Sequence, residues 1–165
     1  MARWLSAALL ALSLLVAVGC GEDEGVAEDA LVSVYVGPPL GGSGSPSGGA
    51  CATARAELVR NKGRAGDVRV RAVCVAAGEG SPLAAIGAGA RRAVEDSSSV
   101  AYLAVADPRA ARFSRTILAA AGIPLVVAPS GEAGMAKVLR AIEAAGDGGR
   151  LREEVAANLE ASPGG

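Results

Sequence analysis

From residue 31 onward, short apolar segments alternate with longer segments whose apolar side chains recur every three or four positions. The short segments are rich in Val, Ile and Leu, and they predict β-strands over 31–36, 67–76, 100–105 and 123–127. The longer segments predict helices over 51–62, 82–95, 108–121, 135–145 and 151–159. We therefore expect an α/β fold: a three-layer, doubly wound parallel sheet of about four strands in the order 2-1-3-4, with helices on both faces.

Two of the predicted helices begin with a capping residue followed by proline, at Ser81-Pro82 and Asp107-Pro108. In the first of these helices, Gly87 and Gly89 predict close packing on the sheet. They do not form a dinucleotide fingerprint, because they lie inside the helix. In the second helix, the apolar stripe predicts a buried face made of Ala110, Phe113, Ile117 and Ala121.

The N-terminus carries a different pattern. A basic start at Arg3 precedes an uncharged apolar run over 4–18, which is as long as a signal-peptide core and too short to cross ~30 Å of hydrocarbon comfortably. The run ends in Ala17-Val18-Gly19-Cys20, which resembles the lipobox of bacterial lipoproteins. This resemblance implies cleavage before Cys20 and lipid attachment to its sulfur. An ordinary signal peptide, an uncleaved anchor and a buried core helix are the alternatives.

These patterns divide the chain into four parts. Residues 1–19 are the expected lipoprotein signal peptide, and 20–30 are an acidic stretch that cannot build a core and is expected to be a flexible tether. Residues 31–161 form the expected α/β lobe, and 162–165 a disordered tail. The protein is therefore expected to be exported and lipid-anchored at the outer face of the cytoplasmic membrane, or periplasmic.

Composition argues against several classes of function. The chain of 165 residues has a formal net charge of −1, with acidic and basic residues interspersed, so no basic block points to nucleic acid. It contains no histidine, the commonest general base and metal ligand. It also lacks a G-x-S-x-G elbow and a Walker loop. We expect no enzyme, no catalytic residue, no cofactor and no metal; a flavodoxin-like or hydrolase-like enzyme is the least favoured alternative.

Two cysteines, Cys51 and Cys74, remain as a pair after export into an oxidising compartment. Cys51 opens a predicted helix, and Cys74 lies near the end of a predicted strand. In a parallel sheet these two points lie at the same edge, so the Cα atoms can approach to the ~4.4–6.8 Å that a disulfide needs. We expect a disulfide that closes a loop of roughly 24 residues; two buried free thiols are the alternative.

Three segments follow one another in a characteristic order: Val34-Tyr35-Val36-Gly37-Pro38-Pro39-Leu40-Gly41-Gly42, then Ala90-Arg91-Arg92-Ala93-Val94-Glu95-Asp96, then Ala120-Ala121-Gly122-Ile123-Pro124-Leu125 with Ala128-Pro129-Ser130. Their order and spacing resemble the N-terminal lobe of type I periplasmic solute-binding proteins, the branched-chain amino-acid (leucine-binding) receptors of ATP-binding-cassette (ABC) transporters. The resemblance covers roughly 31–131.

In that family the amino-acid ligand sits at the carboxyl edge of the sheet, on the loops after the first, third and fourth strands. The resemblance therefore implies ligand-binding residues at Pro39, Leu40, Gly41, Gly42, Ala106, Asp107, Ser130 and Gly131. Free N–H groups at helix starts would favour a carboxylate there. Asp107 departs from this pattern because it brings negative charge to the site, and it is more easily explained as a helix cap.

The resemblance implies an extracytoplasmic lipoprotein that binds a small, amino-acid-like solute for uptake or sensing, with an ABC permease as partner. The family uses two closing lobes, and one lobe cannot bury ~70–90% of a small ligand by itself. A homodimer could supply the second lobe. The alternative is a truncated, non-transporting relative that acts as an interaction protein at the cell surface.

Overall fold

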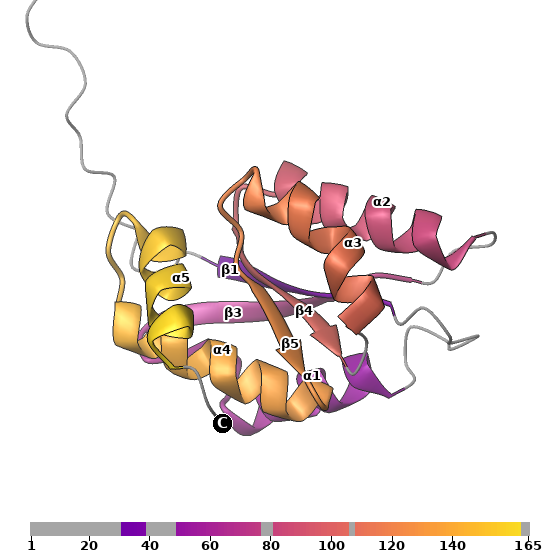
Figure 1. Cartoon of the computed structure of the whole chain (residues 1–165). Helices are drawn as coiled ribbons and strands as arrows, with labels where there is room; N and C mark the ends of the chain where they lie inside the picture. The colour runs from indigo at the N-terminus through magenta and orange to yellow at the C-terminus, as the bar shows by residue number, and fades with distance from the viewer. Residues whose placement is uncertain (1–30, 39–48, 77–80, 106–107, 163–165) are drawn as a thin grey trace, which may run out of the picture.

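The computed structural model describes residues 31–38, 49–76, 81–105 and 108–162 (Figure 1). Strands and helices alternate through most of these ranges. In chain order the elements are β1 (Leu31–Val36), α1 (Ala50–Arg60), β2 (Arg64–Ala65), β3 (Val68–Cys74), α2 (Pro82–Glu95), β4 (Ser99–Val105), α3 (Pro108–Ala119), β5 (Leu125–Ala128), α4 (Gly131–Ala145) and α5 (Leu151–Ala161).

The strands form one mostly parallel sheet of five strands in the order β2-β3-β1-β4-β5. Strand β1 pairs in parallel with β3 and β4, and β5 pairs in parallel with β4. The expected α/β class is confirmed, but the predicted strand count of about four and the order 2-1-3-4 are wrong. The sheet has a further strand, β2, which pairs antiparallel with the start of β3 at the sheet edge.

Strand β2 exists because the chain folds back on itself directly after α1. Gly66 adopts a φ of 57°, a left-handed conformation that glycine reaches without steric cost. The turn places Arg64 opposite Arg69 and Ala65 opposite Val68. Two residues are too few to show an alternation of apolar and polar positions, so the pattern along the chain could not predict this strand.

Helices cover both faces of the sheet, with α2 and α3 on one face and α1, α4 and α5 on the other (Figure 1). Successive side chains of a strand point to opposite faces. In β1, Val34 therefore packs in the larger core with α1, α4 and α5, whereas Tyr35 packs in the smaller core with α2 and α3. The large core is built from Val, Leu, Ile, Met and Ala, and its burial from water is the main stabilising contribution.

The face of α3 that packs on the sheet differs from the predicted one. Its buried residues include Ala110, as predicted, but also Ala111, Ser114 and Leu118, whereas Phe113 is 53% exposed. The predicted inward position of Phe113 is therefore wrong. The rings of Tyr35 and Tyr102 already occupy the smaller core, so mainly small side chains of α2 and α3 face them.

The two glycines of α2 have different surroundings. A Cβ added at Gly89 would lie 2.7 Å from Cγ1 of Val75 and 3.1 Å from the hydroxyl of Tyr102, so Gly89 does allow close packing on the sheet. A Cβ at Gly87 would meet only the guanidinium of Arg91, at 3.6 Å. The predicted packing role is confirmed for Gly89 and wrong for Gly87.

Helix α5 is attached to the rest of the domain through Arg152. Its Nε donates to the carbonyl oxygen of Ser99 at 2.8 Å, and its terminal nitrogens donate to Ser97 O at 2.9 Å and Ala121 O at 3.5 Å. One guanidinium thus satisfies backbone groups before and at the start of β4 and just after α3. The apolar side of α5, made of Leu151, Val155 and Leu159, is buried in the larger core.

Candidate functional site

The parallel strands β1, β3, β4 and β5 end at one edge of the sheet, and the helices that follow them begin there. This carboxyl edge is the usual ligand crevice of open α/β sheets. Most of the predicted ligand-binding residues lie outside the described residues, and so does the predicted lipidation site: Pro39, Leu40, Gly41, Gly42, Ala106, Asp107 and Cys20. Ser130 and Gly131 are described, as are the ends of the strands themselves.

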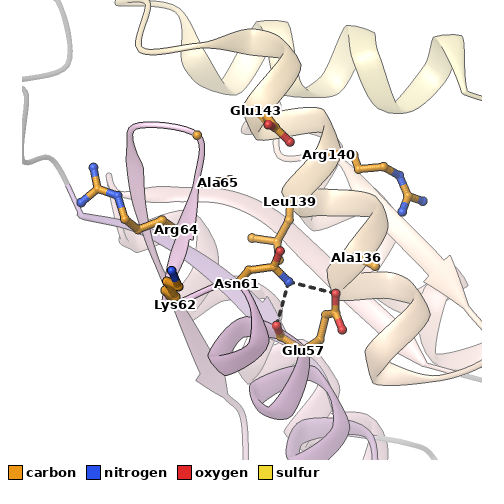
Figure 2. A pocket seen from close by; sticks show the side chains of 10 residues that line it. Glu57, Asn61, Lys62, Arg64, Ala65, Ala136, Leu139, Arg140 and Glu143 are labelled. Atoms are coloured by element: carbon orange, nitrogen blue, oxygen red, sulfur yellow. Dashed lines mark hydrogen bonds between the residues drawn. The ribbon is translucent and has the colours of Figure 1, made fainter.

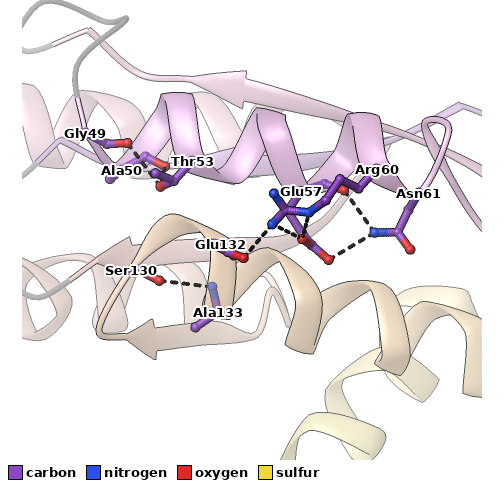
Figure 3. A network of polar contacts seen from close by, with 9 residues as sticks. All are labelled: Gly49, Ala50, Thr53, Glu57, Arg60, Asn61, Ser130, Glu132 and Ala133. Carbon is purple, nitrogen blue, oxygen red and sulfur yellow. Dashed lines mark hydrogen bonds and ion pairs between the residues drawn. The ribbon is translucent and has the colours of Figure 1, made fainter.

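Ser130 is engaged in the structure of its own helix. It is the N-cap of α4, and its hydroxyl oxygen accepts a hydrogen bond from the N–H of Ala133 at 3.1 Å (Figure 3). Such a cap satisfies one of the free N–H groups of the first helical turn. The Ser130 oxygen is therefore already used in a local contact at the position where the resemblance implies a ligand contact.

Gly131 lies where the starts of α4 and α1 meet. A Cβ added to Gly131 would overlap the carbonyl oxygen of Ala50 and would lie 2.6 Å from Oγ1 of Thr53. The Thr53 hydroxyl itself donates to the carbonyl oxygens of Gly49 and Ala50, at 3.1 Å each (Figure 3). Gly131 is therefore buried in a helix contact that brings two helix N-termini together at the carboxyl edge.

The predicted disulfide is present at the same edge. Cys51, in the first turn of α1, is bonded to Cys74, the last residue of β3, with their Cα atoms 5.9 Å apart. It fixes the start of α1 against the sheet.

The sequence pattern did not reveal Tyr102, a buried polar residue of β4 on the face of the sheet that α2 and α3 cover. It is 1% exposed, and its ring lies directly below Gly37, where a Cβ would overlap the Tyr102 hydroxyl. Burial raises the pKa of Tyr102 to about 12, partly opposed by the nearby Ser114 hydroxyl. The Ser114 hydroxyl donates to Ala110 O at 3.2 Å, and among the described residues the Tyr102 hydroxyl has no hydrogen-bond partner.

A polar groove of about 370 Å³ lies at the other end of α1, between β2 and the middle of α4. Figure 2 shows Arg64 and Arg140 pointing away from each other on its two sides, with Asn61 and Leu139 between them. The Asn61 amide donates to the backbone oxygen of Glu57 at 2.9 Å and to its carboxylate at 3.0 Å. The groove joins residues about 80 positions apart in sequence, so no local motif could have predicted it.

Next to this groove, ion pairs join α1 to α4. Arg60 bonds to the carboxylate of Glu57 on its own helix and to that of Glu132 on α4 (Figure 3). The Arg60 and Glu132 side chains are 53% and 57% exposed, so water screens this pair and its contribution to stability is small. The polar contacts of the groove are therefore explained by helix packing, and they leave no buried charge that would call for a ligand.

A second polar cluster, on the opposite face of the sheet, surrounds Asp96 after the end of α2. Its carboxylate accepts hydrogen bonds from Tyr35, Arg71 and Ser98. Burial alone would raise the pKa of Asp96, but the hydrogen bonds from Ser98 and Tyr35 outweigh it and lower the pKa to about 2. Burial, with the hydrogen bond to Asp96, raises the pKa of Tyr35. Every member has a partner, so the cluster is structural.

Within 31–38, 49–76, 81–105 and 108–162, no group of three or more His, Cys, Asp or Glu side chains is placed to hold a metal ion. In the same ranges, no helix has the length and apolar character needed to cross a membrane. No protein-family model, curated protein or solved structure matches the chain significantly.

Proposed function

We propose that this protein is an extracytoplasmic solute-binding-like lipoprotein, related to the substrate-binding proteins of branched-chain amino-acid ABC transporters. It binds a small amino-acid-like solute for uptake or sensing and catalyses no reaction. The observation that supports this is the contact between Gly131 and Ala50, which brings the N-termini of α4 and α1 together at the carboxyl edge of a parallel sheet. That edge is where open α/β sheets commonly bind ligands.

A carboxylate is the chemical group that this edge would recognise best. The first turn of a helix has N–H groups without a partner inside the helix and carries partial positive charge. Ser130 and Thr53 already use their hydroxyls on the backbone, so recognition there would rely on main-chain N–H groups. The Tyr102 hydroxyl, unpaired among the described residues, lies against Gly37 after β1 and adds a buried polar group on the α2 and α3 side of the sheet.

Isothermal titration of the full chain with leucine, isoleucine, valine and small aliphatic amides tests this function. Binding heat and a rise in Tm with the amino acids, but not with the amides, are expected if the carboxylate is recognised. Tyr102→Phe keeps the ring and removes only the hydroxyl, so weaker binding in this variant would assign that group to the site. No heat and no Tm shift at millimolar amino acid would contradict solute binding.

Export and acylation are tested separately. Mass spectrometry of the protein from a membrane fraction should give an N-terminal peptide that begins at Cys20 and carries lipid on it. Cys20→Ser should move the protein out of the membrane fraction. An unmodified Cys20 in a cytosolic protein would contradict the proposed location.

A cell-surface interaction protein is the second candidate, and the structure of the α4 start favours it. The Ser130 oxygen is committed to its helix, and Gly131 has no room for even a methyl group. Both positions are therefore explained without a solute. A protein that is acylated at Cys20 but gives no heat with any tested solute would support this candidate over solute binding.

A further inference from the structure

Helix α3 presents positive charge and an aromatic ring to solvent. Arg109, Arg112 and Arg115 are exposed, the helix contains no acidic residue, and Phe113, the single phenylalanine of the chain, is 53% exposed. On an α-helix, residues three or four positions apart are neighbours, which places Phe113 beside Arg109 and Arg115 beside Arg112. A half-exposed aromatic ring therefore lies beside the cationic side chain of Arg109, on a helix that carries two further exposed arginines.

Helix α2, which packs beside α3 on the same face of the sheet (Figure 1), extends this surface. It adds the exposed cations Arg91 and Arg92, and two large apolar side chains, Leu83 at 38% and Val94 at 37% exposure. Together α2 and α3 carry five arginines and a single glutamate, whereas α1, α4 and α5 on the opposite face together carry five lysines or arginines and six glutamates. The excess positive charge is therefore concentrated on one face of the molecule.

We propose that the outer face of α2 and α3 docks on an anionic phospholipid surface. Arginines interspersed with Phe, Leu and Val are the composition of surfaces that bind at the membrane interface: the cations attract the headgroups and the apolar side chains enter the boundary of the acyl chains. Arg112 and Arg115 form no ion pair within the described residues, so both charges remain available. The proposal rests on the proposed membrane location but not on solute binding.

Charge complementarity favours an anionic lipid surface over a symmetric dimer formed through this face. A second copy packed through the same face would bring like-charged helices together, which is unfavourable. Docking by this face would leave α1, α4 and α5, with the groove of Figure 2, on the side away from the membrane (Figures 1 and 2). A lipid-anchored domain held in this way has one orientation instead of many.

The test places a fluorescent probe on this face. In a Trp4→Phe background, which removes the single native tryptophan, Phe113→Trp reports the surroundings of this position. The full chain is reconstituted in vesicles of phosphatidylcholine alone, or of phosphatidylcholine and phosphatidylglycerol in equal parts. In the anionic vesicles only, we expect the emission of the introduced indole to shift to shorter wavelength and to be quenched by brominated lipid. High salt should reverse both effects.

Two further variants make the outcome specific. Val59→Trp, on the opposite layer and 75% exposed in the native protein, should show the same spectrum in both vesicles. Arg112→Gln with Arg115→Gln, both at exposed positions, should lower the ratio of docked to undocked domain roughly 30-fold. Equal spectra of the Phe113→Trp variant in the two vesicle types would overturn the proposal, as would a shift that grows with protein concentration in neutral vesicles. Co-flotation of the chain with both vesicle types reports anchoring separately.

Discussion

The Tyr35 hydroxyl donates a hydrogen bond to the Asp96 carboxylate at 3.0 Å, joining the central strand β1 to the end of α2 across 61 positions of sequence. Asp96 also accepts hydrogen bonds from Ser98, and Arg71 lies 3.3 Å from it. Burial alone would raise the pKa of Asp96, but the hydrogen bonds from Ser98 and Tyr35 outweigh it and hold the pKa at about 2, against an ordinary value of 3.8. Helix α2 is thus fixed to the sheet by an interaction that needs a deprotonated acid.

The first prediction is a loss of stability in acid. Because the pKa is lower in the folded state than in the unfolded state, the stabilisation is complete above pH ~4 and is lost as the pH falls toward 2. Asp96→Asn should cost about 1–2 kcal/mol at pH 7 and much less at pH 2, measured by urea unfolding at both values. Asp67→Asn, at an exposed position, is the matched control and should change little. An equal cost of Asp96→Asn at both pH values would contradict this explanation.

The disulfide gives a second prediction. Cys51 and Cys74 are 23 positions apart, and a crosslink over this distance restricts the unfolded chain by about 3 kcal/mol. Reductant should therefore lower the free energy of unfolding of the native protein by that amount, which is measured as a lower urea midpoint. Cys51→Ala with Cys74→Ala should have the same low midpoint with and without reductant. A non-reducing peptide map without the Cys51–Cys74 crosslink would show that the pair does not form.

Substitution by alanine should have opposite effects on stability at the two glycines of α2. Gly89→Ala would press a methyl group against Val75 and the Tyr102 hydroxyl, and overpacking of this kind costs about 1–3 kcal/mol. Gly87→Ala meets only a flexible arginine side chain, so the better helix propensity of alanine should add up to about 1 kcal/mol. Urea unfolding of both variants checks this. Stabilisation by Gly89→Ala would mean that α2 lies farther from the sheet.

The hydrophobic pattern predicted the features that depend on local periodicity. It failed where the structure depends on packing between residues distant in sequence. The strands β1, β3, β4 and β5 and the Cys51–Cys74 pair follow from apolar runs and from the geometry of parallel sheets. Phe113 was assigned to the wrong face because a helix carrying many alanines offers several apolar stripes of similar quality. The choice among them depends on the tyrosine rings already filling that core, which helix spacing does not reveal.

At the candidate site the limit is of the same kind. A Ser-Gly pair after a strand is compatible both with ligand contact and with a helix cap, and the sequence cannot separate the two. The structure shows the cap at Ser130 and the close approach of Gly131 to Ala50, which depends on a helix about 80 residues earlier. The sequence also could not predict the unpaired hydroxyl of Tyr102, because the residues around it come from β1, α2 and α3 together.

The last prediction concerns Arg152, whose guanidinium bonds the carbonyl oxygens of Ser97, Ser99 and Ala121. Arg152→Met keeps much of the aliphatic volume but removes the donors, so partly buried carbonyl oxygens lose their partners at a cost of about 1–3 kcal/mol. Arg152→Lys should recover only part of this, because one ammonium group cannot reproduce the planar fork that reaches separate backbone segments. The matched control is Arg140→Met on α4, at an exposed position. Urea unfolding gives the free energies, and hydrogen exchange should show increased opening of α5 in Arg152→Met. If Arg152→Met and Arg140→Met lose equally little stability, the guanidinium contacts do not hold α5 in place, and its attachment is due to Leu151, Val155 and Leu159 alone.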